Sequence, residues 1–147
     1  MSVRYSYTNA ARRLLEDATV LWNHLAGTSE TSAHLAGLSA ECVLKSILIG
    51  LGHAKTYADG QLRDRDLRRH INATELWSEF QSALNGRDGA SYLALLPEER
   101  TFDGWKVDHR YVDSNQLEVA ALQEWYGAPV MMGRLLDCAV ERGQAQQ

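Results

Sequence analysis

Apolar residues recur at intervals of three and four along most of the chain, which is the spacing of one face of an α-helix. The pattern predicts long helices over residues 8–26, capped by Thr8 or Asn9, and over 28–52, 73–84 and 114–140, with a short one over 91–96. No alternating run is long enough to predict a sheet. We therefore expect a single all-α domain over residues 1–147, an antiparallel up-and-down bundle of four to five helices with its core over about residues 10–140.

The second predicted helix is apolar on most sides, which is typical of a central helix. One narrow polar line remains on it, formed by His34, Glu41 and Lys45. Glu41 precedes Lys45 by one helical turn, the favoured order for an ion pair within a helix. We interpret this line either as the polar wall of a functional cleft or as a solvated face with one ion pair.

The predicted loop over residues 53–69 is rich in arginine, and the guanidinium fork suits phosphate groups. Aspartates interleave with these arginines and neutralise part of their charge, so an ordinary solvated loop is the alternative. The arginines that we take as candidate nucleic-acid ligands are Arg63, Arg65, Arg68 and Arg69.

Two expectations concern the end of the chain. Pro129 removes a backbone donor inside the last predicted helix, so we expect a kink near residues 127–129 within one continuous helix. Residues 143–147, beyond that helix, are expected to fray.

Composition narrows the class of protein without naming a function. The 15 Lys and Arg residues against 19 Asp and Glu residues give a net charge of −4, which argues against a generally basic polynucleotide binder and still allows a local basic patch.

The N-terminal residues lack the apolar core of a signal peptide, and the apolar stretch over 42–51 is interrupted and too short to cross a bilayer. We expect a reduced, cytoplasmic protein with no membrane contact. No metal-ligand pair or glycine-rich phosphate loop is found, so neither metal nor cofactor is expected.

The second predicted helix also carries a family resemblance. Its stretch Ser32–Leu51 resembles the second helix of HEPN domains, residues 67–76 are similar to their entry to the third helix, and residues 105–111 are similar to the element before their final helix. The resemblance covers about residues 10–140. It implies a bundle of four or five helices that is usually dimeric. Many members are metal-independent RNases of toxin or phage-defence systems, and others are non-catalytic or partner small nucleotidyltransferases.

Active HEPN members carry an Arg, four to six further residues and then a His, often with a Tyr two residues later. Here His109, Arg110 and Tyr111 match the ending of that motif, with Gly104 where the Arg would stand. Read from Arg110, the position of the His is taken by Asn115. The resemblance therefore implies a site at residues 109–111 with an atypical or degenerate motif.

RNA cleavage without metal needs a base, an acid and a cation at the phosphate. Histidine suits the proton transfer and arginine suits the phosphate, so we assign proton transfer to His109, phosphate binding to Arg110 and orientation to Tyr111. The supporting polar wall would be His34, Glu41, Lys45 and Asn115. The alternative is structural: Arg110 pairs with a nearby aspartate, and Tyr111 packs against Trp105.

Two functions follow from these observations. The first is a HEPN-like protein linked to RNA processing, a candidate metal-independent endoribonuclease of a toxin or defence system. The second is a non-catalytic helical interaction module, such as the partner subunit of a nucleotidyltransferase. Expected partners are a second copy of the chain, RNA, and an antitoxin or a nucleotidyltransferase.

Overall fold

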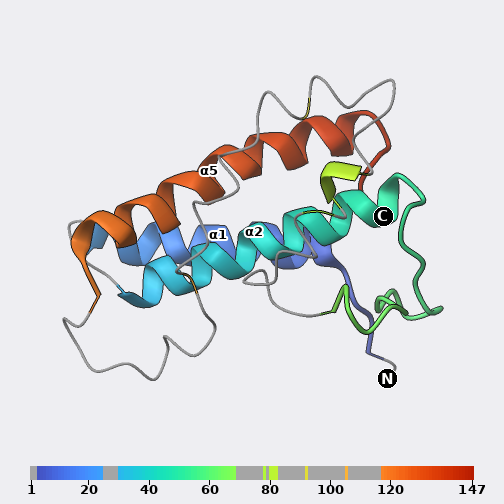
Figure 1. Ribbon diagram of the computed structural model, residues 1–147, viewed down its shortest axis with the longest axis horizontal. Helices are drawn as coiled ribbons and strands as arrows, with labels where there is room; N and C mark the ends of the chain where they lie inside the picture. Colours follow the sequence, from blue (N-terminus) through green and yellow to red (C-terminus); the bar gives the residue numbers. More distant parts are fainter. Residues whose placement is uncertain are drawn as a thin grey trace.

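The computed structural model describes residues 3–24, 30–68, 78, 80–82, 92, 105 and 117–147. The long helices in these residues are α1 (Tyr7–His24), α2 (Glu30–Gly50) and α5 (Val119–Glu141). They lie alongside one another, and α2 packs against both α1 and α5 (Figure 1). The described residues contain no strand, only an isolated bridge between Thr56 and Leu62. The described part of the chain is therefore all-α, as predicted.

Helix α1 begins at Tyr7 because Ser6 caps it. The Ser6 hydroxyl accepts a hydrogen bond from the Asn9 backbone N–H at 3.1 Å, which satisfies a donor of the first turn. The expectation that Thr8 or Asn9 would be the cap is therefore wrong. Thr8 is buried instead, and its Oγ1 donates to the carbonyl of Gln146 at 2.7 Å.

Buried serines at seven-residue intervals on α2 attach it to α1. Ser32 Oγ donates to the carbonyl of Ala18 at 2.5 Å, and Ser39 Oγ donates to the carbonyl of Ala11 at 2.7 Å. The series continues one step further, where Ser46 Oγ lies 2.6 Å from Thr8 Oγ1. Seven residues are about two helical turns, so the serines share one face of α2. The pairing runs in opposite directions along the two helices, and α1 and α2 are thus antiparallel.

Helix α2 is the central helix, as its composition predicts. Its apolar side chains from Val43 to Leu48 are at most 1% exposed. By length and composition the whole of α2 could cross a membrane, whereas the prediction that no segment could do so considered only residues 42–51. In this protein, however, 72% of the most apolar window of α2 is buried. Packing between α1 and α5 accounts for its apolar surface.

The other predicted helices are described in part. Residues Ser78, Phe80–Ser82 and Tyr92 are helical, and Phe80 and Tyr92 are buried, while the remaining positions of 73–84 and 91–96 lie outside the described residues. Helix α5 begins later than predicted because Glu118 is extended, with φ −69° and ψ 139°. It runs through Pro129 as one helix, as predicted; the kink itself stays a prediction.

The last residues do not fray, contrary to expectation. Ala145 and Gln146 are only 5% and 8% exposed. Gln146 Oε1 accepts from the Tyr7 N–H at 2.7 Å, and its Nε2 donates to the carbonyls of Tyr5 and Gly60 at 3.4 and 3.0 Å. This one side chain connects the start of α1 to the loop that follows α2. Burial and hydrogen bonding therefore hold in place a terminal segment that the sequence alone predicts to fray.

Candidate functional site

The ion pair in the polar line of α2 is buried, and His34 is partly buried. Glu41 and Lys45 are each 4% exposed, and Lys45 Nζ donates to the Glu41 carboxylate. The ammonium group also donates to the carbonyl of Arg68 at 3.1 Å. The predicted ion pair is present, but the solvated face proposed for it is wrong, because the loop after α2 folds back over the pair.

Tyr7 and Cys42 border this ion pair. The Tyr7 ring centroid lies 5.8 Å from Lys45 Nζ, and its hydroxyl accepts the Leu62 N–H at 3.3 Å. Burial raises the pKa of Tyr7. Burial, and after it the negative charge of Glu41, raises the pKa of Cys42 to about 12. Cys42 is therefore a protonated thiol near neutral pH and acts as a small core residue, as its apolar surroundings in the sequence indicate.

Toward the N-terminal end of α2 the same line meets Trp105. The indole of Trp105 is 1% exposed and stacks on the His34 imidazole, with ring centroids 5.6 Å apart and planes 17° apart. Gly37 lies beneath it, and a Cβ there would fall well inside van der Waals contact with the indole. Glycine at this position thus makes the close seating of Trp105 on α2 possible.

The loop arginines divide into two kinds. Arg63 and Arg65 are exposed, and Arg63 lies over the Tyr57 ring, 5.4 Å from its centroid. Arg68 is partly buried and contributes its carbonyl to Lys45, which attaches the loop to α2. Of the predicted site residues, the structure therefore brings His34, Glu41, Lys45 and Arg68 onto or beside one face of α2.

Several predicted site residues lie outside the described residues. They are His109, Arg110, Tyr111, Asn115 and Arg69. Within the described part of the chain, no three His, Cys, Asp or Glu side chains gather as a metal-ligand group. The chemistry that the described site offers is thus that of a buried cation fixed by a carboxylate and a carbonyl, with an aromatic stack about 16 Å away along the same helix.

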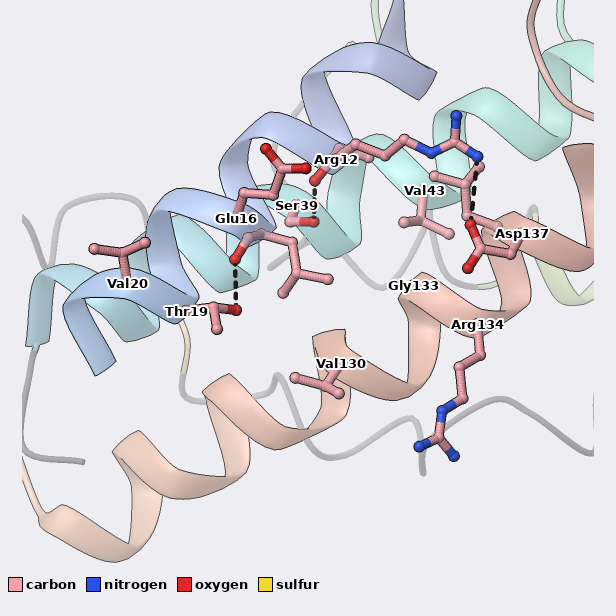
Figure 2. A pocket seen from close by; sticks show the side chains of 13 residues that line it. Arg12, Glu16, Thr19, Val20, Ser39, Val43, Val130, Gly133, Arg134 and Asp137 are labelled. Atoms are coloured by element: carbon pink, nitrogen blue, oxygen red, sulfur yellow. Dashed lines mark hydrogen bonds and ion pairs between the residues drawn. The ribbon is translucent and has the colours of Figure 1, made fainter. Parts of the chain in front are cut away.

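A second feature, which sequence reasoning missed, is a groove of about 610 Å³ between α1 and α5 (Figure 2). Its floor includes Ser39 and Val43 of α2. Arg12 and Asp137 bridge the groove with a 3.3 Å ion pair. Further along, Trp22 and Tyr126 stack with ring centroids 4.4 Å apart. The sequence offered one clue to this groove, the apolar Val20 on the polar side of α1. In the structure Val20 is 68% exposed.

Comparison with protein-family models, with curated proteins and with solved structures gives no match to this chain.

Proposed function

We propose that this chain is a HEPN-like helical protein linked to RNA processing, acting as a metal-independent endoribonuclease of a toxin or phage-defence system with an atypical motif. In this proposal it is a cytoplasmic homodimer that needs no cofactor and has no membrane contact. His109 transfers protons, Arg110 binds the phosphate and Tyr111 orients the substrate.

The observation that carries the proposal is the seating of Trp105 on His34. The proposed site follows Trp105 in the chain, and four residues span at most about 14 Å, so chain length allows His109 to reach the His34 end of the polar line of α2. A buried ion pair usually costs more free energy of folding than a well-packed apolar pair. Glu41 and Lys45 are therefore better explained as support for a site than as a source of stability.

The ion pair can support such a site electrostatically. Lys45 is held by Glu41 and by the Arg68 carbonyl, so its charge is fixed in a low-dielectric environment before any substrate arrives. The exposed Arg63 and Arg65 on the same loop would supply the outer phosphate contacts.

Cleavage of RNA in EDTA tests the proposal. Wild type should cleave, and His109→Ala and Arg110→Ala should each lower the rate by roughly 10²-fold or more. His24→Ala and Arg13→Ala are matched controls, because both residues are exposed on α1. Equal background in all five proteins would exclude the enzyme.

One observation favours the second candidate, a non-catalytic interaction module such as the partner subunit of a nucleotidyltransferase. Lys45 already donates to two acceptors, and Glu41 is buried, so neither offers the open surface that a substrate needs. A chain that folds and cleaves no RNA under any of these conditions would select this candidate.

A further inference from the structure

The groove between α1 and α5 has a regular arrangement of charges on its two rims. Thr19 Oγ1 accepts from the Tyr126 hydroxyl at 3.3 Å, and Arg12 pairs with Asp137, so α1 and α5 are antiparallel. Starting at the Arg12–Asp137 bridge, α1 presents Glu16 and then Val20. Over the same length, α5 presents Arg134 and then Val130.

These residues lie at matching heights. At about 1.5 Å of rise per residue, Glu16 is about 6 Å and Arg134 about 4.5 Å beyond the bridge. By the same measure, Val20 and Val130 lie about 12 Å and 10.5 Å beyond it. The groove is thus flanked by three levels, each with a complementary pair: opposite charges at the first two and two valines at the third.

The second level is the informative one. Glu16 and Arg134 are both exposed, and neither has an ion-pair partner within the described residues. Their side chains point away from each other on the two sides of the groove (Figure 2). Val20 and Val130 at the third level are 68% and 36% exposed. This face therefore holds an unpaired acid, an unpaired base and exposed apolar surface in a fixed order.

We propose that this face binds a second copy of the same chain, through a two-fold axis that runs along the groove. Such an axis places α1 of one copy over α5 of the other at the same height. Glu16 then meets the partner's Arg134, and Val20 meets the partner's Val130. The two Arg12–Asp137 bridges come together as a network of four alternating charges.

The exposed valines decide between this arrangement and its main competitor. A two-fold axis across the groove would stack α1 on α1 in opposite directions. If it crossed between the first two levels, it would pair Arg12 with the partner's Glu16 and Asp137 with the partner's Arg134, so opposite charges meet in that arrangement too. The same axis would carry Val20 and Val130 to the far side of the bridge, away from the partner's valines, and leave their exposed surface uncovered. The axis along the groove matches all three levels, and each contact occurs twice, as a symmetric interface requires.

Charge reversal tests this register. Sedimentation equilibrium should show a wild-type dimer, and Glu16→Arg or Arg134→Glu alone should raise its dissociation constant about tenfold or more, since each reversal acts at two symmetric sites. An equal mixture of the two variants should form a heterodimer about as tight as wild type. In that heterodimer the two substituted side chains face each other with opposite charges at one site, and the native Glu16 and Arg134 face each other at the second site.

Asp17→Arg and Arg13→Glu are controls on the exposed surface of α1, and circular dichroism verifies folding of each variant.

A monomeric wild type at all concentrations would overturn the proposal and leave the groove to a different occupant. A dimer that neither reversal weakens would place the interface elsewhere, and single variants that weaken without rescue in the mixture would contradict the proposed register. The test is independent of RNA cleavage. A groove-mediated dimer without nuclease activity would overturn the proposed enzyme and leave this inference standing.

Discussion

The indole of Trp105 stacks on the imidazole of His34 at 5.6 Å, on a stretch of α2 where Gly37 leaves room for it. This contact joins the segment that precedes the proposed site to the central helix. The indole fits there because Gly37 has no Cβ, and the first prediction concerns the effect of adding one.

Gly37→Ala should destabilise the protein by about 2 kcal/mol, since the added methyl overlaps the buried indole and a rigid ring cannot yield cheaply. Urea unfolding measures the change, and Trp fluorescence reports the altered surroundings of the indole. Gly127→Ala is the matched control: nothing lies within 4 Å of that exposed helical glycine, so it should stabilise by about 0.5–1 kcal/mol. Equal effects of the two variants would show that Gly37 does not seat Trp105.

Breaking the buried ion pair should cost far more than replacing it. Lys45→Met or Glu41→Leu alone should lower the free energy of unfolding by about 3–5 kcal/mol, because each leaves one buried charge without its partner. The double variant should return to within about 1 kcal/mol of wild type. A double-mutant cycle by urea unfolding measures both. Additive losses would mean that the two charges do not depend on each other.

Gln146→Ala should lower the free energy of unfolding by about 3 kcal/mol, because it removes the side-chain hydrogen bonds to Tyr7, Tyr5 and Gly60. Amide hydrogen exchange should rise first at Tyr7, whose N–H loses its acceptor. Gln147→Ala is the control, since Gln147 is exposed. If Gln146→Ala leaves stability and exchange unchanged, the terminal segment does not hold the fold together.

Cys42 should react slowly with iodoacetamide in the folded protein. In a Cys138→Ser background, its alkylation rate should rise about tenfold per pH unit between about pH 8 and 11, because its pKa is raised to about 12. The folded state favours the neutral thiol, so this contribution to stability is complete below the ordinary pKa of 9.0 and is lost as pH rises toward 12. Urea-unfolded protein is the control and should react readily at about pH 8. Equal rates in both states would contradict the burial of the thiol.

The helical periodicity was sufficient to predict the long helices and the central place of α2. It also placed Glu41 and Lys45 one turn apart and so predicted their ion pair. What it could not supply is the environment of that pair, because the Arg68 carbonyl reaches Lys45 only when the loop folds back. The buried end of the chain was missed for the same reason: every partner of the Gln146 side chain is distant in sequence, and local pattern does not encode distant acceptors.

The groove was missed for a different reason. Glu16 and Arg134 are both exposed, and a charged residue on an exposed helix face does not by itself indicate an interface. Their relation to each other depends on how α1 and α5 are paired in space, which a single sequence does not state.

The proposed site requires that the residues after Trp105 lie against the polar line of α2. Nuclear Overhauser contacts in the isotope-labelled protein measure this directly, between the side chains of His34 and Lys45 and those of His109–Tyr111. We predict such contacts, and we predict that they disappear in Gly37→Leu, in which the indole cannot take its place. Well-resolved signals for residues 109–111 with contacts only to other parts of the molecule would contradict the account.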